Sequence, residues 1–127
     1  MMAGIGGRNT KPEVLVRRAL HGAGFRFRLH RRDLPGSPDI VLPKHVVAIQ
    51  VHGCFWHRHA NCRFATVPAS NRAFWTNKFR ENVERDLRKK RALQKLGWKV
   101  YIVWECETAR PARVARLITW LQQLGDG

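Results

Sequence analysis

Two apolar runs, DIVL and HVVAIQV, stand on either side of Pro43 and Lys44, and they constrain the fold more than any other stretch of the sequence. A Pro-containing turn between two apolar runs is typical of a hairpin between neighbouring strands. The pattern predicts an antiparallel hairpin in the middle of a sheet. Asp39 opens its first strand, and Val51 and His52 close its second.

A helix and a strand are expected before this hairpin. Thr10 is followed three residues later by Glu13 and then by an apolar run, which is the pattern of a capping box at the start of a helix. Gly22 and Gly24 end that helix. Residues 25–30, FRFRLH, then alternate apolar and basic side chains with the period of a strand that has one buried face.

Two helices and one strand are expected after the hairpin. Residues 70–97 have the pattern of a long helix that stops at Gly97, with a break expected near Asn82. Residues 98–105 form a buried strand, and residues 110–125 form the last helix. One face of that helix carries Val114, Leu117, Leu121 and Leu124.

The order of elements indicates the fold class. A helix, three strands, a helix, a strand and a helix follow one another, and a long crossover helix between two strands makes them parallel. The sheet is therefore expected to be mixed and flanked by helices, in the α/β class. With 127 residues, the chain is expected to form a single domain over residues 10–127, preceded by a short flexible arm over residues 1–9.

The charge of the chain narrows the classes of partner. The 24 Lys and Arg residues against 9 Asp and Glu residues give a formal net charge of +15, which favours a polyanion as partner. No apolar run approaches the roughly 20 residues that span a bilayer, so nucleic acid is preferred over a membrane. The N-terminal MMAGIGG lacks the features of a secretion signal, and a cytoplasmic location is expected.

The stretch HGCFWHRHANC contains several candidate metal ligands. Cys54, His59 and Cys62 lie close in sequence, and Cys106 follows the last strand, where the chain returns to the same edge of the sheet. Three thiolates and one imidazole suit a closed tetrahedral zinc site, which would be structural rather than catalytic. The alternative is that the cysteines are packed thiols and His59 is a solvated side chain.

Asp39 is the candidate ligand for a second metal. Its carboxylate and the main-chain carbonyl of Val51 are expected side by side at the sheet edge, where such oxygens suit Mg²⁺. Many nucleases add an acid and a lysine on the next strand, and the second acid is missing here. His52 and His57 are candidates for the proton transfers that remain, although either histidine can instead be a packed residue.

Two further carboxylates are candidates for orienting these histidines. Asp86 lies on the apolar side of its helix, where a buried carboxylate needs a partner, and a histidine from the sheet edge is the expected one. A salt bridge to a neighbouring arginine is the alternative. Glu13 is a candidate for orienting His57, and its place in a capping box is the simpler explanation.

These motifs together resemble one family, the very short patch repair (Vsr) endonucleases, bacterial enzymes that nick DNA at T:G mismatches. The resemblance covers the chain from Asn9 to Cys106. The segments that carry it are NTKPE, LPGSPDIV, VHGCFWH, VPASNRAFW, NVERD and LGWKVYIVWEC.

The resemblance implies a restriction-endonuclease-like core and a role for each candidate residue. Asp39 and the main chain of Val51 would hold Mg²⁺, His57 with Glu13 would act near the attacking water, and His52 paired with Asp86 would lie on the phosphate side. A structural Zn²⁺ and a set of intercalating aromatic residues are also implied. The zinc ligands would be Cys54, His59, Cys62 and Cys106, and the aromatic residues would be Phe55, Trp56 and Trp75.

The expected function is hydrolysis of the phosphodiester 5′ to the mispaired thymine, in the repair of deaminated 5-methylcytosine. The alternatives are an inert zinc-stabilised DNA-binding module and a restriction-type endonuclease that cuts paired DNA. We expect a monomer associated with the bacterial nucleoid, with mismatch-repair accessory proteins as further partners. The candidate phosphate contacts are Arg26, Arg28, Arg31, Arg32 and Lys89, with Arg88, Lys90 and Arg91 as further basic candidates.

Overall fold

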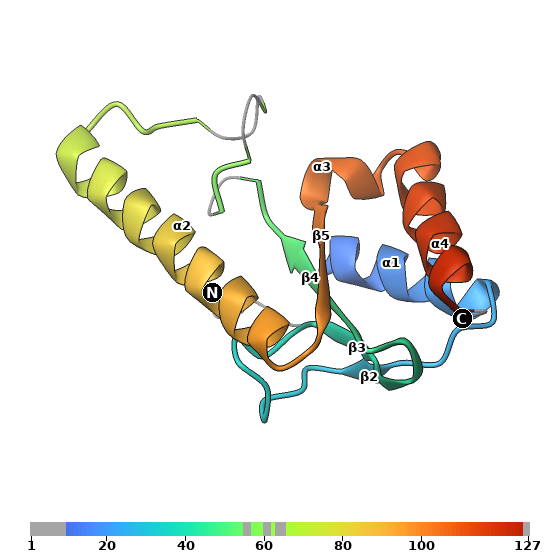
Figure 1. Ribbon diagram of the computed structural model, residues 1–127. Coiled ribbons are helices and arrows are strands. Elements are labelled where there is room, and N and C mark those ends of the chain that lie inside the picture. Colours follow the sequence, from blue (N-terminus) through green and yellow to red (C-terminus); the bar gives the residue numbers. More distant parts are fainter. Residues whose placement is uncertain (1–9, 55–56, 60–61, 63–65, 126–127) are drawn as a thin grey trace.

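The computed structural model describes residues 10–54, 57–59, 62 and 66–125. Within these residues the strands form one mixed sheet in the order β2, β3, β4, β5 (Figure 1). Neighbouring strands are antiparallel from β2 to β4, whereas β4 and β5 are parallel. The strand bounds are Arg28–Leu29 for β2, Ile40–Leu42 for β3, Val47–His52 for β4 and Lys99–Trp104 for β5.

The predicted hairpin is confirmed as β3 and β4, joined by a short 3-10 turn over Pro43–His45. Ile40 pairs with Ile49, and Leu42 pairs with Val47. All of β3 and the first half of β4 are fully buried. Strands covered on both faces carry continuous rather than alternating apolar residues, which explains the two runs in the sequence.

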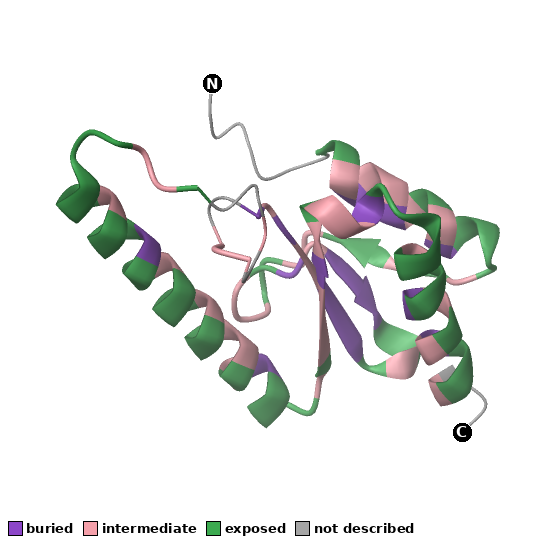
Figure 2. Cartoon of the chain, turned by 90° about the horizontal axis from the view of Figure 1, so that it is seen from above, coloured by how far each residue is buried: buried purple, intermediate pink, exposed green. Residues whose placement is uncertain are grey.

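Helices cover both faces of the sheet (Figures 1 and 2). Helices α1 and α4 lie together on one face, where Val16 and Leu20 of α1 meet Leu117 and Leu121 of α4 in the main core. Helix α2 lies on the other face and has few buried side chains. The helix bounds are Lys11–Gly22 for α1, Arg72–Lys95 for α2, Glu105–Thr108 for α3 and Pro111–Gly125 for α4.

This mixed sheet flanked by helices confirms the expected α/β class and is consistent with a restriction-endonuclease-like core. Thr10 caps α1, because its hydroxyl accepts the N–H of Glu13 at 3.4 Å. The break expected near Asn82 was wrong, since α2 is continuous over its 24 residues. An interior Asn costs a helix well under about 1 kcal/mol, and α2 contains neither Pro nor Gly.

The strand expected over residues 25–30 is shorter than its alternation predicts. Phe25 and Phe27 pack against the core, but only Arg28 and Leu29 pair with β3. The alternation fails at Leu29, which is exposed, and the left-handed φ of 50° at His30 turns the chain. Among the described residues, no helix is both long enough and apolar enough to cross a membrane.

Candidate active site and metal centre

Asp39 lies immediately before β3, against the end of β4. Its Oδ2 accepts the main-chain N–H of Val51 at 2.7 Å, so the two residues meet, but through the amide of Val51. The N–H and C=O groups of one strand residue leave the backbone on the same side. The carbonyl of Val51, the group expected to bind Mg²⁺, therefore faces the same edge. Burial raises the pKa of Asp39 to about 6, and the negative charge of Glu13 adds to the rise.

Asp86 pairs with His57, and not with His52 as the sequence analysis expected. Its Oδ2 lies 2.5 Å from Nδ1 of His57. The reason is a turn after β4, in which the N–H of His57 donates to the carbonyl of Gly53 at 3.1 Å. Burial opposes ionisation of Asp86, but the hydrogen bond and charge of His57 outweigh it and hold the pKa of Asp86 below its usual value.

His52 lies beneath His57 instead. The two imidazole rings are stacked, with centroids 3.9 Å apart and planes 11° apart. His52 is 7% exposed, and its Nδ1 is buried without a hydrogen-bond partner in the described part of the chain. Burial, together with the charge of His57, lowers the pKa of His52 to about 4. His52 is therefore neutral at physiological pH.

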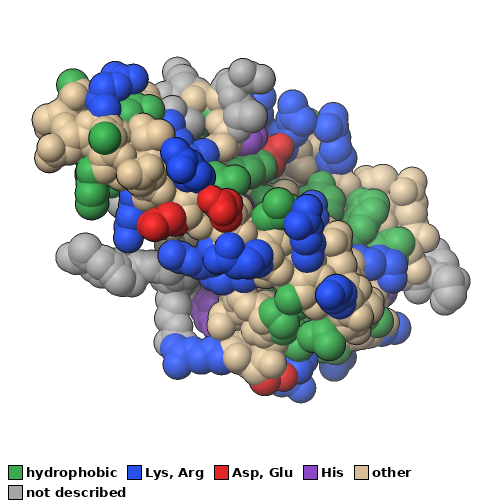
Figure 3. Space-filling view, turned by 60° about the vertical axis from the view of Figure 1, so that its left-hand side comes forward, with side chains coloured by type: hydrophobic (Ala, Val, Ile, Leu, Met, Phe, Trp, Pro, Cys, Tyr) green, Lys and Arg blue, Asp and Glu red, His purple; other side chains and the backbone are tan. Residues whose placement is uncertain are grey.

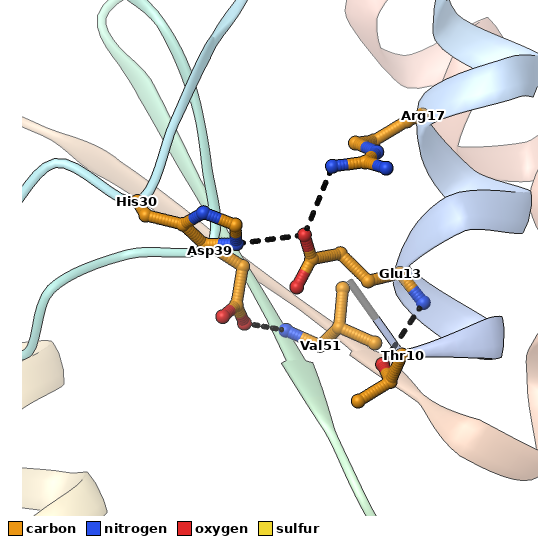
Figure 4. A network of polar contacts seen from close by, with 6 residues as sticks. All are labelled: Thr10, Glu13, Arg17, His30, Asp39 and Val51. Atoms are coloured by element: carbon orange, nitrogen blue, oxygen red, sulfur yellow. Dashed lines mark hydrogen bonds and ion pairs between the residues drawn. The ribbon is translucent and has the colours of Figure 1, made fainter. Parts of the chain in front are cut away.

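Glu13 does not contact His57, so this expectation was also wrong. Its Oε2 lies 2.8 Å from Nε2 of His30 and 3.4 Å from Nη1 of Arg17 (Figure 4). The Glu13 side chain is almost fully buried. The cause is the left-handed turn at His30, which directs the imidazole toward α1 rather than along the charged face expected for the strand.

One cavity of about 180 Å³ brings the chemically active residues together. Lys89 and Lys90 of α2 complete its polar lining, and the Lys89 side chain lies against Gly36 so closely that a Cβ there would be 2.9 Å away. Carboxylate, imidazole and ammonium groups thus face one space large enough for a phosphate group. The cavity is lined among others by Asp39, Val51, His52, His57 and Asp86.

The expected cysteine and histidine set is also brought together. Ligand atoms of Cys54, His59, Cys62 and Cys106 all lie within 4.8 Å of one another, and this cluster can hold a metal ion. Nδ1 of His59 lies 3.7 Å from Sγ of Cys54 and 3.4 Å from Sγ of Cys106. Nitrogen and sulfur ligands of a tetrahedral zinc are about 3.6 Å apart, so these spacings fit that ion.

Trp104 connects the cysteine and histidine cluster to the cavity. Its ring stacks on His59, with centroids 4.3 Å apart, and presents its edge to His52 at 5.2 Å. Glu105 fixes the same region, since its Oε1 accepts the N–H of Cys54 at 3.3 Å. A metal bound by the cluster would therefore stabilise the chain on both sides of His57.

The candidate phosphate contacts lie in different places. Lys89 lines the cavity, whereas Arg26 and Arg28 line a separate pocket beside the β3–β4 turn. Arg31 is paired with Asp33, and Arg32 is exposed. Figure 3, with α2 toward the viewer, shows Lys and Arg side chains spread over this face.

Of the aromatic residues expected to intercalate, only Trp75 can be placed. It lies in the first turn of α2, partly buried, and stacks on Phe79 with centroids 5.7 Å apart. Its neighbour Phe74 is 58% exposed. Phe55 and Trp56 lie outside the described residues.

Neither the pairing of His30 with Glu13 nor the position of Trp104 was predicted from the sequence. His30 was assigned to the charged face of a strand because the alternation of FRFRLH includes it. A signal for the turn was present in the polar run that follows, RRDLPGSPD, which is too rich in turn residues for a continuing strand. Trp104 gave no such signal, because an aromatic residue in an apolar strand is ordinary.

Comparison with known proteins identifies the family of the chain. Residues 1–63 match the family model described as DNA mismatch endonuclease Vsr. The type II nicking enzyme V.XorIIP of Xanthomonas oryzae pv. oryzae is 50% identical over 107 residues, which cover 84% of this chain and 78% of that protein. The type II nicking enzyme V.NmeAIP of Neisseria meningitidis serogroup A is 43% identical over 122 residues, covering 93% and 86%.

A third relative carries the name of the family itself. The DNA mismatch endonuclease Vsr of Escherichia coli strain K12 is 46% identical over 105 residues, which cover 83% of this chain and 67% of that protein. Identity at this level over most of both chains, together with the family model, shows the family. The chain belongs to the Vsr family of DNA mismatch endonucleases.

Proposed function

We propose that this endonuclease nicks one strand of DNA at a T:G mismatch and hydrolyses the phosphodiester 5′ to the mispaired thymine. It would act at the bacterial nucleoid, as a monomer, in the repair of deaminated 5-methylcytosine. The observation that carries the proposal is the single cavity that joins Asp39 to the His57–Asp86 pair. A relative named as a mismatch endonuclease supports the choice of substrate.

In this proposal His57 takes the proton of the attacking water. Asp86 accepts the Nδ1 proton, which leaves Nε2 unprotonated and able to act as a base. His52 supports the ring of His57 by stacking and stays neutral itself. Lys89 and Lys90, which also line the cavity, would bind the phosphate group.

Mg²⁺ fits the edge formed by Asp39 and Val51. Burial raises the pKa of the Asp39 carboxyl, so a bound cation would stabilise its charged form, and carboxylate and carbonyl oxygens are ligands that Mg²⁺ prefers. When bound, the ion would supply Lewis-acid stabilisation of charge on the phosphate. Zn²⁺ fits the cysteine and histidine cluster, in a closed set of four ligands that leaves it a structural role.

We assign recognition of the mismatch to a set of aromatic residues. Inserting a ring between base steps costs a few kcal/mol, and least where pairing is already defective. Trp75 is one such residue, with Phe55 and Trp56 as proposed partners. The exposed ring of Phe74 is a further candidate on the same turn.

A cleavage assay with Asp39→Ala tests the proposed function. Wild-type protein in Mg²⁺ should nick one strand of a T:G duplex and leave the matched T:A duplex intact. Asp39→Ala should abolish nicking and retain binding, because it removes the metal ligand but no proposed DNA contact. Glu84→Ala, which removes an exposed carboxylate of α2, is the control and should nick normally.

Two outcomes would replace this function by another. Binding without cleavage by the wild-type protein would favour an inert zinc-stabilised DNA-binding module. Equal cutting of both strands of paired DNA would favour a restriction-type endonuclease. Strand-resolved gel electrophoresis of end-labelled duplexes distinguishes all three.

A further inference from the structure

Glu13, His30 and Asp39 form a second polar cluster, which shares Asp39 with the cavity that His57 lines. They come from α1, from the chain after β2 and from the residue immediately before β3 (Figure 4). One ligand atom from each lies within 4.8 Å of the others. The Glu13 side chain is 1% exposed and that of His30 is 17% exposed, so the cluster is largely shielded from water.

The main chain fixes His30 in this position. Its N–H donates to the carbonyl of Asp39 at 3.0 Å, which continues the pairing of β2 with β3 by one residue. The left-handed φ of 50° at His30 then turns its ring toward Glu13. His30 is therefore held next to Asp39 by the backbone, independently of its bond to Glu13.

The charges in the cluster favour a cation. Arg17 contacts Glu13 and can balance one of the two carboxylates. The other carboxylate, Asp39, accepts the main-chain N–H of Val51, a neutral donor, at 2.7 Å. A divalent cation between the three side chains would offset this excess negative charge.

We propose that His30 supplies a nitrogen ligand, through Nε2, to a divalent cation held with Glu13 and Asp39, and that this cation is preferentially a transition metal such as Mn²⁺. The inference rests on the proposed function in one respect, because Asp39 is the residue assigned there to the catalytic metal. The inference adds His30 to the ligands assigned there, and it makes a transition metal such as Mn²⁺, rather than Mg²⁺, the preferred ion.

The spacing of the donor atoms supports this assignment. Adjacent ligands of an octahedral metal, each at about 2.1 Å, are about 3 Å apart. Nε2 of His30 lies 2.8 Å from Oε2 of Glu13, so both atoms can bind one ion with little movement. Mg²⁺ prefers an all-oxygen set, whereas imidazole nitrogen favours transition metals. His30 would therefore shift the preference of the site away from Mg²⁺.

Mn²⁺ binding followed by electron paramagnetic resonance tests the proposal. Loss of the free-ion signal gives the affinity of the zinc-loaded protein for Mn²⁺, and competition gives its affinity for Mg²⁺. Wild type should bind Mn²⁺ more tightly, and pulsed spectra of the bound ion should show coupling to nitrogen. His30→Gln keeps an N–H donor for Glu13 but should weaken Mn²⁺ binding by about tenfold to a hundredfold and remove the coupling.

Matched variants locate the bound ion. His21→Gln, an exposed histidine near the end of α1, should change neither affinity nor coupling. Asp39→Asn should abolish binding of both ions at this cluster. If the nitrogen coupling survives in His30→Gln, or if wild type shows no coupling, His30 is not a ligand and the proposal is overturned.

Nicking of the T:G duplex in Mg²⁺ is measured on the same samples. Nitrogen coupling that depends on His30, without nicking, would remove the proposed function and retain the metal site. Nicking without such coupling would retain the proposed function and remove the proposed metal site.

Discussion

His52 is an ionisable side chain in an environment that disfavours its charge. It is buried at the end of β4 between the rings of His57 and Trp104, and burial lowers its pKa to about 4. In the unfolded chain the same group would have a pKa of about 6.5. The unfolded state therefore binds a proton at a pH where the folded state does not, and acid should destabilise the fold through this residue.

We expect the wild-type protein to lose about 2 kcal/mol more stability than His52→Gln between pH 7.5 and pH 5. The contribution of His52 is complete above the unfolded pKa of about 6.5 and is lost as the pH falls toward 4. Urea denaturation at the two pH values gives both free energies of unfolding. His21→Gln is the control and should follow the wild type. Parallel losses in wild type and His52→Gln would show that His52 does not carry this pH dependence.

Residue identities were easier to predict than residue pairings. Asp39, His52, His57 and Asp86 were selected from the sequence, and all four line one cavity. Their partners depend on loop geometry. The turn between Gly53 and His57 brings His57, and not the expected His52, to Asp86. A turn of this kind is set by a few backbone dihedral angles, which residue type and spacing do not specify.

The cysteine and histidine cluster joins elements that are far apart in the sequence. Cys54 follows β4, whereas Cys106 lies in α3 and donates its N–H to the sulfur of Cys54 at 3.5 Å. Burial raises the pKa of the Cys54 and Cys106 thiols, so the ligands are protonated until a metal displaces the protons. A bound metal would thus connect the loop that carries His57 to the end of β5.

Cys106→Ala should therefore release zinc and destabilise the domain. Loss of a structural metal is among the few single changes that cost more than about 4 kcal/mol, which corresponds to a fall in Tm of more than about 10 °C. Zinc content measured by mass spectrometry and Tm measured by circular dichroism test this. Removing zinc from the wild type with a chelator should lower Tm by a similar amount. A soluble, well-folded Cys106→Ala protein with unchanged Tm would exclude a structural zinc.

Elements with strong local signals were predicted well. The capping residue Thr10 and the apolar runs around Pro43 located α1 and the hairpin, because these signals lie within a few residues of the elements they define. Strand β2 was predicted too long, and α3 was not predicted. Both are short, and tertiary contacts rather than their own sequence set their bounds.

At the scale of the whole molecule, the basic residues behind the net charge of +15 lie on several surfaces. These surfaces need not all contact one DNA duplex. Lys89 and Lys90 line the cavity with Asp39 and His57. Arg26 and Arg28 line a different pocket, together with Lys44 in the turn of the hairpin. If the cavity is the site of cleavage, as proposed, the basic residues of α2 that line it would be the contacts of the scissile phosphate.

Lys89→Gln should therefore weaken DNA binding in a way that depends on salt, and should slow nicking as well. Each phosphate contact contributes about 0.9 to the slope of log affinity against log salt concentration, so the variant should reduce that slope by about 0.9. Fluorescence anisotropy with a T:G duplex over a series of NaCl concentrations measures this slope.

Lys44→Gln removes the same charge beside the hairpin turn and is the matched control. Because its pocket is separate from the cavity, it should leave the rate of nicking of the bound duplex unchanged. Equal changes of the salt slope of binding and of the rate of nicking in the two variants would contradict this prediction. In that case the net charge of the protein, rather than the position of each lysine, determines the effect, and the scissile phosphate does not bind in the cavity.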